Sequence, residues 1–156
     1  MFQSTVVRST EWVGEMMAKL ALKDERKALR ALRAGLHAIR DRLPAYEAVD
    51  LGAQLPTLMR GLYYEGWRLT EAPERVRRPE ELFARVGHEL ANDASLSPEA
   101  VVRATIAILS HHVTEGELDD VARVLPRRIA ELWSESLEPP PAATAAPSQP
   151  APTSPR

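Results

Sequence analysis

The feature of this 156-residue sequence that most constrains its fold is an internal repeat, because a shift of 70 residues aligns its two halves without a gap. Tyr63 then matches Trp133 as one of several conservative pairs. Identical residues recur on both sides of the shift: Leu20 and Leu90, Glu47 and Glu117, Asp50 and Asp120, Leu55-Pro56 and Leu125-Pro126, and Leu62 and Leu132. A gapless match of this length indicates a duplicated structural unit, so what one copy predicts can be compared with the other.

Each copy has the residue pattern of helices. In copy one, apolar residues recur at steps of three and four, which places them on one stripe of a helix; they are Leu29, Leu32, Leu36, Ile39 and Leu43. The matching residues 101–109 are almost continuously apolar and would by themselves also suit a buried strand, but the match to copy one predicts a helix. Pro56 and Pro126 each predict the start of a further helix, since proline lacks the NH that a helix interior needs.

The predicted fold is all-α: a compact bundle of about eight short helices, built from two pseudo-symmetric four-helix repeats. Repeat one covers residues 9–67 and repeat two residues 79–137, within one domain of residues 1–138. From residue 139 onward, proline recurs among Ala, Ser and Thr, so we expect residues 139–156 to form a disordered tail.

Composition limits the kinds of core and site that the chain can form. Hydrophobic residues make up 44% and aromatic residues only 5%, which predicts an aliphatic core. Without cysteine there is neither a disulfide framework nor a thiolate metal site. Residues 1–8 are too polar for a signal peptide, and the longest apolar run is far shorter than the ~18 residues of a membrane span. We therefore expect a cytoplasmic protein.

Two stretches of copy one carry a family resemblance. Leu51-Gly52-Ala53-Gln54-Leu55-Pro56 followed by Arg60-Gly61-Leu62-Tyr63-Tyr64-Glu65-Gly66-Trp67 resembles the bacterial family known as domain of unknown function 2267 (DUF2267), over roughly residues 9–137. Copy two departs from the aromatic part of this motif, with Trp133-Ser134-Glu135-Ser136 at the matching positions. The resemblance implies a small helical bacterial protein, often found in stress-related settings, and implies no reaction.

The aromatic run of copy one is the first candidate for a binding surface. Tyr63 continues an apolar helix face and is expected in the core, whereas Tyr64 lies about 100° further around the helix and is expected to be more exposed. Trp67 follows Gly66, a residue suited to end a helix, and either covers the bundle or anchors a partner. We predict a partner-binding surface; its residues are Tyr64, Trp67, Arg60 and Arg68.

A basic helix face is the second candidate. Arginines recur at helical spacing opposite the apolar stripe of copy one and suit contacts with phosphates; they are Arg26, Arg30, Arg33 and Arg40, with His37 among them. The competing interpretation is a solvated face paired with neighbouring acids. No recognition motif or basic tail accompanies it, so nucleic-acid binding is the alternative function and not the favoured one.

The third candidate is a group of metal-ligand types in copy two: His111, His112, Glu115, Glu117, Asp119 and Asp120. His111 and Glu115 are four residues apart, but Thr114 is predicted to cap a helix between them. Glu117 is expected to complete a capping box with Thr114. We therefore predict no metal, no cofactor and no catalytic residue, and keep metal binding or an enzymatic activity based on His111 as a second alternative.

The favoured function is a non-enzymatic helical interaction or adaptor module with an unidentified protein partner and no membrane contact.

Overall fold

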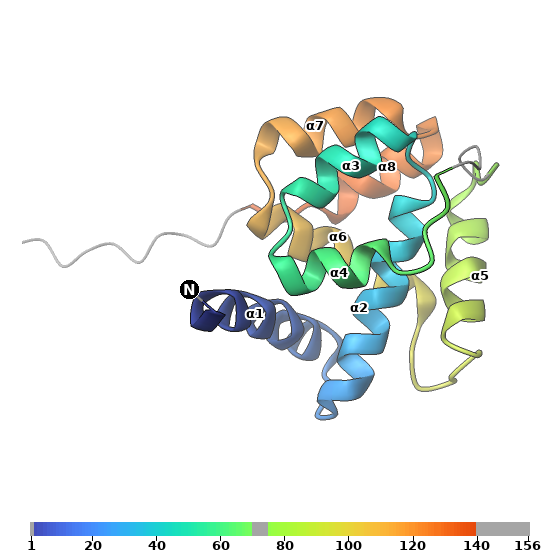
Figure 1. Cartoon of the computed structure of the whole chain (residues 1–156). Helices are drawn as coiled ribbons and strands as arrows, with labels where there is room; N and C mark the ends of the chain where they lie inside the picture. The colour runs from blue at the N-terminus through green and yellow to red at the C-terminus, as the bar shows by residue number, and fades with distance from the viewer. Residues whose placement is uncertain (1, 70–74, 140–156) are drawn as a thin grey trace, which may run out of the picture.

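In the computed structural model, which describes residues 2–69 and 75–139, the chain folds into α-helices joined by short connections (Figure 1). The side chains of residues 2, 3 and 5 are not described. The helices are α1 (Phe2–Leu20), α2 (Glu25–Arg40), α3 (Ala45–Ala53), α4 (Thr57–Tyr64), α5 (Pro79–Glu89), α6 (Pro98–His112), α7 (Glu115–Val124) and α8 (Arg127–Ser136). The all-α prediction is confirmed, and the apolar segment 101–109 is helical.

Helices α2 and α6 form the centre of the bundle. They contact each other, and both also contact α1 and α5, while α4 packs on α2 and α8 packs on α6. Helix α3 runs beside α7 across the top of the bundle in the view of Figure 1. The contacts within one copy recur between the helices about 70 residues away, for example α1 with α2 and α5 with α6, while α2–α6 and α3–α7 join matched helices of the two copies. Whether the two copies superpose stays a prediction.

Individual bonds also recur at the shift of 70 residues. The Tyr63 hydroxyl donates to the Ala48 carbonyl at 2.7 Å, and the Trp133 indole NH donates to the Leu118 carbonyl at 3.2 Å. In each copy, therefore, the last helix of the unit bonds the preceding helix through one buried aromatic side chain. Burial raises the pKa of Tyr63, which keeps its hydroxyl a donor.

The core is less aliphatic than composition predicts. Trp12, Tyr63 and Trp133 are among the largest fully buried side chains, with exposed fractions of 0%, 0% and 1%. Leucine, isoleucine, valine and methionine surround them in one continuous cluster. The aromatic content of a sequence gives the number of rings but not their positions, and here three of the rings are buried in the core. Leu55 and Leu125, the residues before the matched prolines, are both buried.

The sequence signals for helix starts correspond to the observed ends. Pro56 and Pro126 immediately precede α4 and α8, and their carbonyls accept the first helical NH bonds. Pro79 is the first residue of α5. The Ser97 hydroxyl accepts from the Ala100 NH at 3.2 Å and caps α6.

In the described part of the chain, no helix combines the length and the hydropathy that crossing a membrane requires. The predicted tail lies, apart from its first residue, outside the described residues.

Candidate functional site

The aromatic run of copy one forms a ring cluster at the C-terminal end of α4. The rings of Tyr63 and Tyr64 meet edge to face with centroids 4.9 Å apart, and those of Tyr64 and Trp67 are 5.4 Å apart and tilted by 36°. Tyr63 is buried as predicted, whereas Tyr64 and Trp67 are half-buried against the core. Exposed Leu69 follows. We call Tyr64, Trp67 and Leu69 the aromatic surface.

Gly52 on α3 makes room for these rings. A Cβ atom at this position would lie 2.7 Å from Tyr64 Cζ and 3.0 Å from Tyr63 Cε1, with the Tyr64 hydroxyl nearer still. Both distances are far below van der Waals contact, so the two rings can approach α3 this closely only because residue 52 lacks a side chain. The glycine of the family-like motif therefore fixes where Tyr64 sits.

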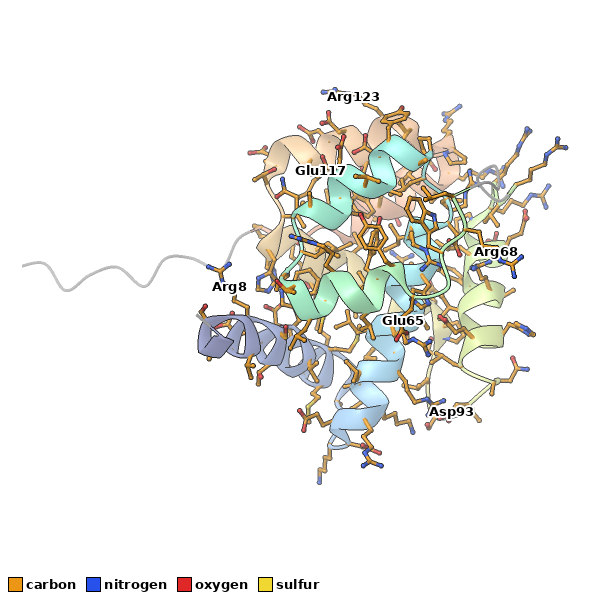
Figure 2. The ribbon with its side chains drawn as sticks, viewed as in Figure 1. Arg8, Glu65, Arg68, Asp93, Glu117 and Arg123 are labelled. Carbon is orange, nitrogen blue, oxygen red and sulfur yellow. The ribbon has the colours of Figure 1, made fainter. Side chains whose placement is uncertain are left out.

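Arg60 has a structural role that the sequence did not predict. Its Nε donates to the Gly52 carbonyl at 2.9 Å, and its Nη2 donates to the carbonyls of Ala53 and Leu55 at 3.1 and 3.0 Å. The guanidinium thereby caps the C-terminal end of α3, where helix carbonyls lack helical partners. These bonds show that Arg60 positions the α3–α4 corner. The residue is exposed, and its contact with a partner stays a prediction. Arg68 is exposed beyond the end of α4 (Figure 2).

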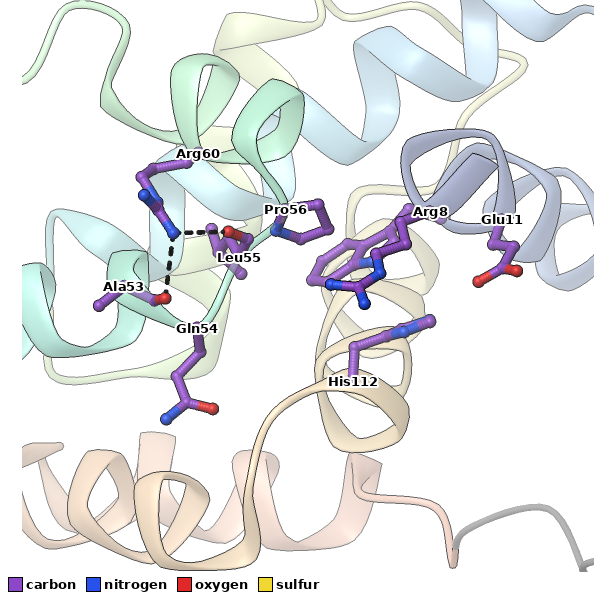
Figure 3. Close-up of a pocket in the computed structure, with 9 residues that line it drawn as sticks. Arg8, Glu11, Ala53, Gln54, Leu55, Pro56, Arg60 and His112 are labelled. Carbon is purple, nitrogen blue, oxygen red and sulfur yellow. Dashed lines mark hydrogen bonds between the residues drawn. The ribbon is translucent and has the colours of Figure 1, made fainter. Parts of the chain in front are cut away.

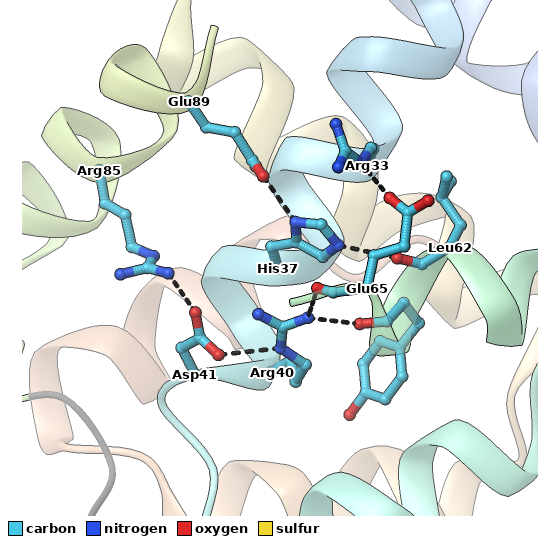
Figure 4. A network of polar contacts seen from close by, with 9 residues as sticks. Arg33, His37, Arg40, Asp41, Leu62, Glu65, Arg85 and Glu89 are labelled. Carbon is cyan, nitrogen blue, oxygen red and sulfur yellow. Dashed lines mark hydrogen bonds and ion pairs between the residues drawn. The ribbon is translucent and has the colours of Figure 1, made fainter. Parts of the chain in front are cut away.

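Arg40 is not a surface arginine, contrary to the predicted phosphate-binding role. Only 3% of it is exposed, and its Nη1 donates to the carbonyls of Tyr63 and Glu65, each at 2.7 Å (Figure 4). Its Nε pairs with Asp41 at 2.8 Å. Arg40 lies on the part of α2 that α4 covers, so helical spacing alone placed it wrongly on a solvated face.

His37 is buried beside Arg40 and connects three helices. Its Nδ1 lies 2.6 Å from Glu89 Oε1 of α5, and its Nε2 lies 2.7 Å from the Leu62 carbonyl of α4. Both of these neighbours are oxygen atoms that can accept a hydrogen bond. Burial acts to raise the pKa of Glu89, but the hydrogen bond and charge of His37 outweigh it and hold that pKa below its usual range.

The rest of the predicted basic face is divided. Arg33 pairs with Glu65 after α4, while Arg26 and Arg30 are exposed on the outer side of α2. Asp41 also pairs with Arg85 of α5 (Figure 4). Most of the basic positions thus hold α4 and α5 against α2. Within the described part of the chain, only Arg26 and Arg30 of the four predicted phosphate contacts have a side chain without a hydrogen bond or ion pair.

The histidines of copy two meet an acid from α1 instead of the acids near them in sequence. His111 Nδ1 lies 3.0 Å and His112 Nε2 lies 2.6 Å from the two oxygens of Glu15. The His112 ring also stacks on Trp12, with centroids 4.8 Å apart. The predicted group of six ligand types is therefore not assembled around His111.

A polar cleft of about 330 Å³ opens between α1 and the corner before α4 (Figure 3). Arg8 of α1 and His112 of α6 lie on one side of the cleft, and Gln54 of the corner lies on the other (Figure 3). The Gln54 side-chain oxygen accepts from the Thr114 NH at 3.2 Å, so this side also joins α3 to the start of α7.

That bond leaves the capping box of α7 half-formed. The Thr114 hydroxyl accepts from the Glu117 NH at 3.4 Å, as predicted. The return bond, in which the Thr114 NH would donate to the Glu117 carboxylate, is not made, because that NH donates to Gln54 instead. The prediction that Glu117 completes the box is wrong in this respect, and its carboxylate points elsewhere.

Glu117 of α7, labelled in Figure 2, lies close to Glu47 of α3, the helix that α7 packs against. Both residues are buried, with exposed fractions of 8% and 4%, and exposed Asp50 lies beside them. One carboxylate oxygen from each of the three lies within 4.8 Å of those of the other two. We call Glu47, Asp50 and Glu117 the carboxylate cluster. Burial, then the hydrogen bond and charge of Glu47, raise the pKa of Glu117.

Comparison with known proteins bears on the whole bundle. A sequence model of the family described as "Uncharacterized conserved protein (DUF2267)" matches residues 9–132. The chain belongs to the DUF2267 family. The match includes the ring cluster and the carboxylate cluster, and it confirms the resemblance drawn from residues 51–56 and 60–67. No protein with a curated description matches this DUF2267 chain.

The carboxylate cluster is the arrangement that sequence reasoning missed in this DUF2267 protein. A usable signal was present, since Glu47 matches Glu117 and Asp50 matches Asp120 at the shift of 70 residues. Matched helices of a duplicated unit often pack against each other. When they do, an acidic residue of one copy can lie close to the matching acidic residue of the other. The assignment of Glu117 to a capping box concealed that consequence.

Proposed function

We propose that this DUF2267 chain is a non-enzymatic interaction module that binds a protein partner in the bacterial cytoplasm. The observation that supports this proposal is the aromatic surface, in which Tyr64 and Trp67 are exposed in part and held in fixed positions. Partly exposed Tyr and Trp side chains beside an arginine are the residue types that dominate binding energy at protein interfaces. The stress-related setting that the family resemblance implies stays a prediction.

Rigidity makes this surface suitable for binding. Tyr64 lies against Gly52, and Trp67 follows Gly66, whose φ of +69° is a left-handed conformation that turns the chain back after α4. Rings already fixed in the free protein lose little conformational entropy when a partner covers them. Leu69, with 67% of its surface exposed, adds an apolar side chain next to them.

The ion pairs disfavour the nucleic-acid alternative. Arg40 is buried and Arg33 pairs with Glu65, which leaves Arg26 and Arg30 as exposed cations of that predicted face. Two phosphate contacts give weak and strongly salt-dependent binding. The histidine-based alternative is disfavoured in the same way, since His111 and His112 both contact Glu15.

The test uses three changes on the aromatic surface: Tyr64→Ala, Trp67→Ala and Leu69→Glu. The unfolding free energy of each variant is measured by chemical denaturation, and partner capture from lysate of the native host is compared with that of the parent. Because the two rings are half-buried, we expect each alanine variant to lose about 1–2 kcal/mol and to remain folded. Leu69→Glu is expected to leave stability almost unchanged, and all three variants are expected to lose the same captured protein.

The matched control is Val7→Glu on α1, an exposed apolar side chain changed to the same acid away from the aromatic surface. It is expected to capture the partner as the parent does. A loss of about 3 kcal/mol or more in both alanine variants would show that the rings serve the core. Unchanged capture by all three variants would also refute the proposal.

A further inference from the structure

The carboxylate cluster contains two buried acids that have no cationic partner among the described residues. Glu47 Oε1 and Glu117 Oε1 are fully enclosed and accept no hydrogen bond in the structure. None of the ion pairs within residues 2–69 and 75–139 involves either glutamate. Buried carboxylates are normally paired with a cation, because leaving one unpaired costs several kcal/mol.

The spacing of the three carboxylates suits a metal ion. Two oxygens bound to one ion at about 2.4 Å can be at most about 4.8 Å apart. The oxygens of Glu47, Asp50 and Glu117 satisfy that limit in every pair. Glu47 and Asp50 lie three residues apart on α3, which puts them on the same side of the helix. Glu117 completes the set from α7.

The donor set also indicates the kind of ion. All three donors are carboxylate oxygens, which are hard ligands preferred by Ca²⁺, Mg²⁺ and Mn²⁺. Zinc and copper sites usually include His or Cys. No histidine belongs to the cluster, and the chain has no cysteine. Asp50 is exposed, so solvent reaches the cluster at this side and water can complete the coordination.

We propose that Glu47, Asp50 and Glu117 bind one divalent cation of the hard, oxygen-seeking class, and that the ion links α3 to α7. Bound there, it neutralises the two buried glutamates and holds the third helix of copy one against the third helix of copy two. This inference is independent of the partner-binding function, because it rests on residues outside the aromatic surface.

The experiment compares thermal unfolding of the full chain, stripped of metal with a chelator, before and after addition of Ca²⁺, Mg²⁺ or Mn²⁺ in separate arms. We expect at least one cation to raise the melting temperature by about 5–10 °C at a hundredfold excess over its Kd. Calorimetric titration is expected to give one site per chain. Glu47→Gln and Glu117→Gln are expected to weaken that Kd at least tenfold.

Asp50→Asn provides a variant whose folding is not at risk, because the residue is exposed, and it is also expected to weaken the Kd at least tenfold. The matched control is Asp119→Asn, which removes an exposed acid from the same helix as Glu117 and is expected to keep the parent Kd. The proposal is overturned if none of the three cations shifts the melting temperature of the parent chain. It is equally overturned if the cluster variants and Asp119→Asn bind the cation with the same Kd.

Discussion

Gly35→Ala tests how closely the two central helices approach each other. A Cβ atom at residue 35 would lie 2.9 Å from Thr105 Cβ and 3.1 Å from Thr105 Cγ2. Thr105 is fully buried, and its hydroxyl donates to the Val101 carbonyl at 2.8 Å, so its side chain is fixed in place. Rotation about χ1 cannot move a Cβ atom, and relief therefore requires α2 and α6 to separate.

The expected magnitude follows from two opposing effects. Overpacking of a tight core site costs about 1–3 kcal/mol, and a Cβ–Cβ clash belongs at the upper end. Replacement of a helical glycine by alanine returns about 1 kcal/mol. We expect Gly35→Ala to lose about 2 kcal/mol of unfolding free energy, which corresponds to a fall of roughly 4–8 °C in the melting temperature for a chain of this size.

Urea denaturation measures this loss, and two further variants isolate its cause. In a Thr105→Gly background the clash is absent, so the same Gly35→Ala change should become neutral or stabilising. Gly61→Ala is the matched control, because Gly61 is exposed on α4 and a Cβ atom there meets nothing within 4 Å. It should gain up to about 1 kcal/mol. The reasoning is refuted if Gly35→Ala is as stable as the parent, or costs the same in both backgrounds.

Four further substitutions address the core, the buried Arg40 and the buried acids. Leu55→Asp and Leu125→Asp should each lose several kcal/mol in chemical denaturation, since both side chains are buried, and parent-like unfolding of either would contradict its matched position. Arg40→Ala should lose about 2–4 kcal/mol by freeing two carbonyls at the end of α4, whereas a loss below about 0.5 kcal/mol would show that these bonds are dispensable. In the metal-free chain, the pKa of Glu117 is raised, so the folded protein keeps a proton that the unfolded chain releases. The free energy of unfolding is therefore highest at acid pH and falls as pH rises above the ordinary pKa of a glutamate. The free energy of unfolding of Glu117→Gln should therefore rise relative to that of the parent with increasing pH, by up to about 1.4 kcal/mol per pH unit. A difference between the two free energies that stays constant from pH 4.5 to 8 would contradict this.

Much of the candidate site was predictable where it depended on one helix at a time. The core position of Tyr63 followed from the apolar face that it continues, and the left-handed turn at Gly66 followed from its place after α4. Arg40 was misjudged, because the carbonyls that it binds belong to another segment of the chain. The capping bonds of Arg60 were missed for the same reason. A sequence shows which side of a helix an arginine occupies, but not which neighbouring helix covers that side.

By itself, the sequence determined the all-α class and the starts of helices α4 to α8, because apolar periodicity, capping hydroxyls and prolines act within a few residues of backbone. Only the tertiary structure decided which polar groups lie inside. Gln54 reaches the Thr114 NH across 60 residues and frees the Glu117 carboxylate, which then faces Glu47. That outcome depends on how α3 and α7 pack against each other. Local signals do not encode it, since the competing partners of a buried polar group are brought together only when the helices meet.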